Sequence, residues 1–107
     1  MEKYTIKVKV GRELIFLEVH SIICIKAENI YTFICTTQRT FLATQTFGEM
    51  EEKLNQSIFF KPHRSYLINL KFIRKYLKSD GTLYLFDYDF PVPVSRNRKH
   101  LLQKLIH

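Results

Sequence analysis

Basic side chains in a stiff bend are the clearest chemical feature of this 107-residue sequence. Pro62 fixes its own φ and favours an extended conformation at Lys61, which leaves His63 and Arg64 at the tip. The arginine guanidinium is a planar donor fork suited to phosphate oxygens and to guanine O6 and N7. We therefore interpret Arg64, aided by Lys61 and His63, as a nucleic-acid contact. Ordinary loop charges are the alternative, and His63 has a second role open to it, a hydrogen bond that holds the bend.

A second basic stretch begins at Ser95, a suitable N-cap for a C-terminal helix. Arg96 and Asn97 would then lie in the first helical turn. Free backbone N–H groups and the positive end of the helix dipole favour a phosphate there. We interpret this stretch as a phosphate contact, and a solvated basic helix face is the alternative.

The connection formed by residues 26–31 is a third candidate. Asn29 and Tyr31 can donate and accept hydrogen bonds to bases or phosphates. On composition alone, a plain connection between two strands is the favoured interpretation of this segment. Contact with nucleic acid is the alternative.

The sequence carries no signature of catalysis or of a metal site. Its three glycines are far apart, and its four histidines lack the spacing of metal ligands. Asp87 and Asp89 fall in a predicted turn, which their side chains can cap. Cys24 and Cys35 occur in apolar runs and are interpreted as buried, reduced residues of a cytoplasmic chain, with a disulfide or redox role as the alternative. We predict that the protein is not an enzyme and needs no cofactor or metal.

Positive charge is concentrated in the C-terminal half of the chain. The net charge of +7 and the pI of about 9.5 favour a polyanionic partner. Residues 61–78 and 95–107 together hold ten of the 17 Lys and Arg residues and none of the 10 Asp and Glu residues. No apolar run approaches the ~20 residues that a membrane span requires. Nucleic acid is therefore the expected partner, and a membrane is not.

The elements that position these residues are mostly strands. Thr46–Glu49 matches a capping box, which predicts a helix of about two turns ending near Asn55. Pro91 and Pro93 place the last strand at a sheet edge, because proline cannot donate to a ladder. We predict one mainly-β domain over residues 1–107, with one short internal helix, a short C-terminal helix and no recognition helix. Period-two alternation and β-branched runs predict about nine strands, over 4–10, 13–19, 22–26, 30–36, 39–42, 66–70, 72–77, 82–86 and 90–94.

Several of these segments, taken together, resemble the LytTR DNA-binding domains. Residues 60–73 resemble that family's core, written F-x-x-H-R-S, three hydrophobic residues and N, followed by an apolar Ile. Residues 22–32 are similar to its I-x-x-I-x-A-x-x-N-Y segment, 46–54 to its short helix, and Pro93–Arg96 to its closing hydrophobic-S-R. The resemblance covers essentially the whole chain.

This resemblance implies an elongated stack of antiparallel β-sheets that inserts loops, rather than a helix, into successive major grooves. Members are mostly bacterial transcription regulators, among them response regulators of two-component systems, and they often act as two protomers on repeated sites. Many carry a phospho-receiver domain, for which 107 residues leave no room, so we expect a stand-alone regulator or an isolated domain. The resemblance implies base or backbone contacts at Asn29, Tyr31, Arg64 and Arg96, and phosphate contacts at Lys61, Asn97, Arg98 and Lys99.

We therefore hypothesise sequence-specific binding of double-stranded DNA and regulation of bacterial transcription. Promoter sites with direct repeats are the expected partner, and a homodimer is expected on the DNA. Two alternatives stay open. A non-specific binder of RNA or single strands would stack bases on Tyr31, Tyr66 and Phe60. A protein-interaction module would pair through the edge strand over residues 90–94.

Overall fold

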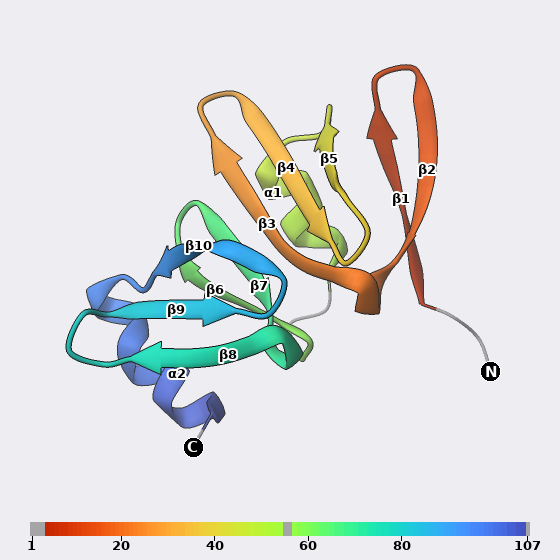
Figure 1. Cartoon of the computed structure of the whole chain (residues 1–107). Helices are drawn as coiled ribbons and strands as arrows, with labels where there is room; N and C mark the ends of the chain where they lie inside the picture. The colour runs from red at the N-terminus through yellow and green to blue at the C-terminus, as the bar shows by residue number, and fades with distance from the viewer. Residues whose placement is uncertain (1–3, 55–56, 107) are drawn as a thin grey trace.

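A computed structural model describes residues 4–54 and 57–106 of the chain. Ten strands, two α-helices and three short 3-10 turns form three antiparallel sheets (Figure 1). The sheets stack into a body with principal extents of 43 × 37 × 23 Å. This architecture confirms the predicted mainly-β fold with one short internal helix and one short C-terminal helix.

The central sheet has five strands in the order β5-β4-β3-β7-β6, so β3 and β7 lie in its middle. All four residues of β7 are buried, since both faces of this sheet are covered. Leu67 packs into one core, whereas Tyr66 and Ile68 pack into the other, which confirms the predicted alternation. The strands are β3 (Ile22–Glu28), β4 (Tyr31–Thr36), β5 (Thr40–Ala43), β6 (Phe59–His63) and β7 (Tyr66–Asn69).

A hairpin and a helix cover one face of the central sheet. The hairpin consists of two predicted strands that pair antiparallel, β1 (Thr5–Val10) and β2 (Glu13–Glu18), and the helix is α1 (Phe47–Lys53). Thr46 caps α1 as predicted, because its Oγ1 accepts a hydrogen bond from Glu49 N at 3.1 Å. The predicted helix end near Asn55 lies outside the described residues, but Leu54 is already extended. This face therefore carries a separate apolar core, centred on residues such as Val8, Ile25, Met50 and Leu67.

A three-stranded sheet and the C-terminal helix cover the other face. The sheet has the order β10-β9-β8, which confirms that the strand with the two prolines lies at an edge. A second apolar core fills the space below it, around residues such as Ile23, Phe60, Ile68, Leu83 and Leu102. Over the described ranges, no helix is long and apolar enough to cross a membrane. The elements are β8 (Ile73–Leu77), β9 (Thr82–Leu85), β10 (Tyr88–Pro93) and α2 (Lys99–Ile106), with 3-10 turns at Val19–Ser21, Leu70–Phe72 and Arg96–Arg98.

The strand β6 was not among the predicted strands, because Pro62 indicated a bend. Its pairing with β7 shifts register between Phe60 and His63, so β6 contains a β-bulge. A bulge leaves one residue outside the ladder, and proline is tolerated there because no ladder N–H is required of it. The strand thus continues through Pro62 to His63, and the tip of the bend narrows to Arg64 and Ser65.

Two predicted connections also differ from the structure. β3 continues through Ala27 and Glu28, which were predicted to interrupt it, and Ile30 lies in the turn rather than in the next strand. The turn between β9 and β10 contains Asp87, with φ of 61°, whereas Asp89 belongs to β10. In both places the ladder extends the strand beyond the point where the local apolar pattern ends.

Cys24 and Cys35 are free and buried, as predicted, and they are direct partners on β3 and β4. The hydrogen bond between the two thiols, together with burial, raises the pKa of Cys24. A raised pKa keeps this sulfur protonated at neutral pH and therefore unreactive. Both side chains pack in the second core.

Asn69 is a buried polar residue that joins three elements. Its side chain is 1% exposed, and its Nδ2 donates to the Ile22 carbonyl at 3.0 Å. Its Oδ1 accepts a hydrogen bond from Lys71 N at 3.1 Å. Asn69 therefore ends β7, starts the following 3-10 turn and ties both to the beginning of β3.

Replacing Asn69 with Ala is expected to lower the free energy of unfolding by about 2–4 kcal/mol, because a buried carbonyl and an N–H lose their partners. Urea denaturation followed by circular dichroism measures this loss. Gln103→Ala, on an exposed position of α2, is the control and should change stability by less than about 0.5 kcal/mol. A loss no larger than that of the control would contradict the role of Asn69.

Candidate nucleic-acid interface

Two hairpin turns lie at the same end of the central sheet. The β3–β4 turn consists of Asn29 and Ile30, and the β6–β7 turn consists of Arg64 and Ser65. β3 and β7 are antiparallel neighbours, and Ala27 N donates to Ser65 O at 2.8 Å, so the end of β3 lies beside the start of β7. The first and third candidate segments are thus adjacent in space.

The C-terminal basic stretch is tied to the same end through the carbonyl of Pro62. Ser95 N donates to Pro62 O at 2.8 Å, and Ser95 Oγ approaches the same oxygen at 3.2 Å. Arg64 follows Pro62 by two residues, and Arg96 follows Ser95 by one residue. In Figure 1 the β3–β4 turn, the β6–β7 turn and the segment after β10 succeed one another along the left side of the molecule. We call these three segments the contact edge.

The predicted N-cap role of Ser95 is wrong. Residues Arg96–Arg98 form a 3-10 turn, α2 begins only at Lys99, and the Ser95 side chain caps neither. Its hydroxyl lies instead against the Pro62 carbonyl and, at 3.0 Å, against Asn97 Oδ1. The Ser95 side chain thus contacts Pro62, far away in the sequence, instead of the N–H groups of the turn that follows it. Arg96 and Asn97 stay exposed on the contact edge.

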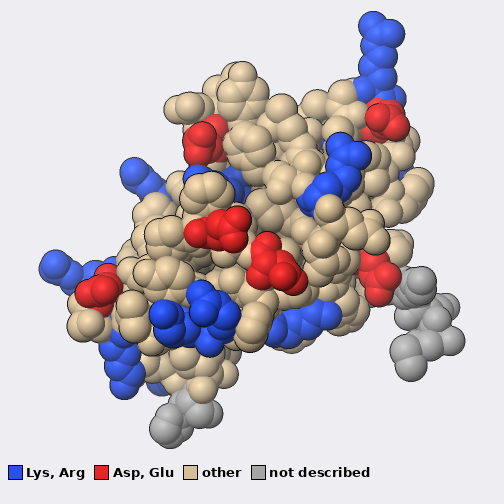
Figure 2. All heavy atoms as spheres, in the orientation of Figure 1, with Lys and Arg blue, Asp and Glu red and all other residues tan. Residues whose placement is uncertain are grey.

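Among the residues that the structure describes, the arginines of the contact edge have no acidic partner. The ion pairs among the described residues are Lys26–Glu28 and Lys61–Glu51. Within that part of the chain, Arg64, Arg96, Arg98 and Lys99 therefore form none. Figure 2 shows Lys and Arg side chains along the left margin and across the lower half of the same view, with others at the upper right and Asp and Glu side chains among them. Cations that form no ion pair at the contact edge favour a polyanion there.

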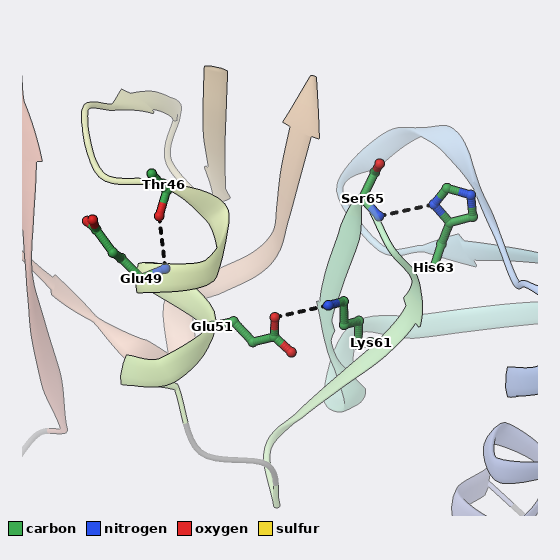
Figure 3. A network of polar contacts seen from close by, with 6 residues as sticks. All are labelled: Thr46, Glu49, Glu51, Lys61, His63 and Ser65. Atoms are coloured by element: carbon green, nitrogen blue, oxygen red, sulfur yellow. Dashed lines mark hydrogen bonds and ion pairs between the residues drawn. The ribbon is translucent and has the colours of Figure 1, made fainter. Parts of the chain in front are cut away.

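Lys61 has a different environment from Arg64. Its Nζ lies 3.1 Å from Glu51 Oε1 and 5.5 Å from the centre of the Phe47 ring, so it joins β6 to α1 (Figure 3). The ion pair neutralises part of its charge. The geometry shows this contact with α1, and a phosphate contact at Lys61 stays a prediction.

Lys99 is partly covered by the turn between β8 and β9. A Cβ added at Gly81 would lie 2.7 Å from Lys99 Cε, and Gly81 also has a positive φ of 63°. The missing side chain of Gly81 therefore makes room for the end of Lys99. Arg98, like Lys99, is half-buried, whereas Arg64 and Arg96 are exposed.

His63 holds the β6–β7 turn from within. Ser65 N donates to His63 Nδ1 at 3.1 Å, as Figure 3 shows. A neutral imidazole that accepts at Nδ1 carries its proton on Nε2. The structural role proposed for His63 thus has a contact that supports it, and a DNA contact through Nε2 stays a prediction.

Three exposed residues lie in the β3–β4 turn and at the start of β4. Asn29 has a φ of 56°, a left-handed conformation that asparagine tolerates better than most residues. Tyr31 is 47% exposed, and its ring lies 6.3 Å from that of Phe33. Ile30 is 89% exposed and was not among the predicted site residues, because apolar residues carry no hydrogen-bonding signal.

A pair of tyrosines supports the contact edge from behind. The Oη atoms of Tyr66 and Tyr88 lie 2.9 Å apart and link β7 to β10. Burial and this hydrogen bond raise the pKa of Tyr88, which keeps its hydroxyl neutral. Tyr66 and Phe60 are 5% and 7% exposed, so they cannot stack on bases. Two of the three aromatic rings on which a single-strand binder would stack bases are therefore inaccessible.

Comparison with known proteins identifies the family. Residues 12–107 match the LytTr DNA-binding domain. The chain belongs to this family. It is 31% identical over 109 residues to the transcriptional regulatory protein YpdB of Escherichia coli K12, covering 99% of this chain and 45% of that protein. It is 26% identical over 108 residues to the sensory transduction protein LytT of Bacillus subtilis, covering 98% and 44%.

A solved structure shares this fold. A LytTr DNA-binding domain from Bacillus cereus superposes with a TM-score of 0.77 at 23% identity, covering 98% of both chains. The chain spans less than half the length of the two curated relatives named above. Family membership confirms the predicted fold and the prediction of DNA binding rather than catalysis.

The role of His63 can be measured at the Ser65 amide. We expect His63→Ala to speed hydrogen exchange of Ser65 N–H about five- to tenfold, because a lost hydrogen bond is worth about 1 kcal/mol. NMR measures the rate residue by residue. His100→Ala, at an exposed position, should leave this rate unchanged. An unaltered rate in His63→Ala would show that the hydrogen bond does not protect the turn.

Proposed function

We propose that this LytTr domain binds double-stranded DNA sequence-specifically by inserting the contact edge into successive major grooves. The observation that carries the proposal is the pair of main-chain hydrogen bonds, Ala27–Ser65 and Ser95–Pro62, that holds three polar segments at one end of the sheet. Nothing in α1 or α2 is needed as a recognition helix. The strands supply the scaffold, and the turns supply the reading side chains.

The unpaired arginines have the chemistry for the main contacts. Arg64 and Arg96 would contact guanine edges or adjacent phosphates, since a guanidinium suits both. Asn29 and Tyr31 would supply hydrogen bonds from the β3–β4 turn. Phosphate contacts by Asn97, Arg98 and Lys99 would contribute most of the affinity and make it depend steeply on salt.

The names of the relatives support a role in transcription. YpdB is a transcriptional regulatory protein and LytT a sensory transduction protein. We propose that this chain likewise regulates transcription in the bacterial cytoplasm, where its DNA lies. We also propose that two protomers occupy direct repeats at a promoter.

Arg64→Ala and Arg96→Ala are each expected to weaken binding to a duplex selected from a random pool. A lost base contact corresponds to about 1–3 kcal/mol, and a lost phosphate contact lowers the salt slope by about one. Fluorescence anisotropy at two salt concentrations separates these cases. A base contact also predicts relaxed preference at one position of the site.

Arg39→Ala is the matched control for these variants. Arg39 is an exposed arginine at the opposite end of the central sheet, where it lies 4.7 Å from the centre of the Phe41 ring. It should bind the duplex as wild type does. Equal losses of affinity in all three variants would show that overall charge, and not the contact edge, determines binding. Unchanged affinity in Arg64→Ala and Arg96→Ala would contradict the assignment of these arginines to the DNA-binding site.

Binding as two protomers predicts a dependence on the spacing of repeats. A duplex with two direct copies about 21 base pairs apart, or two helical turns, should bind two chains, because both copies then face the same side of the helix and each chain has its own pair of grooves. Moving one copy by about half a turn should weaken joint binding. Sedimentation of the complexes counts the chains. Only one chain bound at saturation would rule out the two-protomer arrangement.

A further inference from the structure

Ile30 is an unusual residue for a turn, and its exposed side chain does not stabilise the fold. It is 89% exposed, more than any other large hydrophobic residue in the described segments. It sits at the tip of a two-residue turn, where small or polar residues are usual. Neither turn chemistry nor packing explains an isoleucine here. Positions that break such rules are expected where a residue serves function.

The turn that carries Ile30 is well defined. Glu28 and Tyr31 pair across it, and Lys26 Nζ lies 3.0 Å from Glu28 Oε1 near its base. Asn29 takes the positive φ, so Ile30 keeps an ordinary backbone conformation. A β-branched side chain has few χ1 rotamers. The isoleucine is thus held at the tip of a defined turn on the contact edge, with few side-chain rotamers, beside the turn of Arg64.

An apolar side chain at this place has one chemical counterpart on DNA. Isoleucine can neither donate to a phosphate nor hydrogen-bond to a base edge. In the major groove the C5-methyl group of thymine is the apolar feature of the base-pair edges. The neighbouring Asn29 has an amide, and asparagine pairs with N6 and N7 of adenine. Together the two turn residues match an A·T-containing step.

We propose that Ile30 recognises thymine through contact with its C5-methyl group, and that the β3–β4 turn therefore selects A·T pairs. The inference rests on the proposed binding of duplex DNA and gives one of its segments a base preference. Arg64 and Arg96, by contrast, suit guanine or phosphate. The three segments of the contact edge would then read different chemical features of one site.

The test replaces thymine by uracil, which pairs identically but lacks the methyl group. Each thymine of a duplex selected with the wild-type chain is changed in turn. At one position or at neighbouring positions, wild type should lose about three- to tenfold in affinity, as expected for one buried methyl group. Ile30→Ala should bind the thymine duplex about as weakly as wild type binds the uracil duplex, and it should not distinguish the two.

Two controls separate this contact from general effects. Ile30→Val keeps a branched apolar side chain and should keep the sensitivity to uracil. Phe16→Ala removes an exposed apolar residue, 68% exposed, from β2, and it should also keep that sensitivity. Because Ile30 is exposed, Ile30→Ala should unfold at the same temperature as wild type.

The outcomes distinguish the inference from the function on which it rests. If wild type binds its selected duplex but tolerates every uracil, the thymine contact is refuted and DNA binding stands. The same holds if Ile30→Ala stays as sensitive to uracil as wild type, or if its affinity for the thymine duplex is unchanged. If wild type binds no duplex in the selection, both proposals fail together.

Discussion

The carbonyl of Pro62 holds the contact edge of this domain together. It points out of the edge strand β6 and accepts a hydrogen bond from Ser95 N at 2.8 Å, with the Ser95 hydroxyl at 3.2 Å. The bulge in β6 accommodates a proline that cannot donate to the ladder. Two basic segments that lie far apart in the sequence thereby become neighbours. This contact, together with the second core, fixes the C-terminal segment relative to Arg64.

A sheet with two buried faces gives this contact a firm base. β3 and β7 lie between two apolar cores, and Asn69 ties the start of one to the end of the other. The end of β3 lies beside the start of β7, and the β3–β4 and β6–β7 turns lie there. The second core also places β10, and with it Ser95, against β6. Packing far from the turns therefore decides where the polar side chains project.

Local patterns in the sequence predicted much of this fold. Alternation identified the first hairpin and the two faces of β7, and the prolines identified the edge strand. The Thr46 cap was also found, because its partner lies three residues away. These features depend on neighbours within a few residues, so the sequence alone contains them.

Features that depend on distant partners were missed. Ser95 was read as a helix cap because its actual partner, Pro62, lies 33 residues away. The ion pair of Lys61 was not predicted, because its partner, Glu51, belongs to another element. Tyr66 and Phe60 were offered as stacking platforms, although the sheet of β8–β10 covers them. The candidate contact residues were proposed from their type and from the resemblance, whereas their common edge required the structure.

The positions that would read DNA contribute almost nothing to the two cores. Ile30, Arg64 and Arg96 are all exposed, and the scaffold beneath them is complete without their side chains. At these three positions, the proposed recognition of DNA and the folding of the domain would therefore depend on separate residues. A lineage could exchange one turn residue for another and acquire a new promoter site at little risk to the stability of the protein. The same separation makes the turns suitable for randomisation when new sequence preferences are sought in the laboratory.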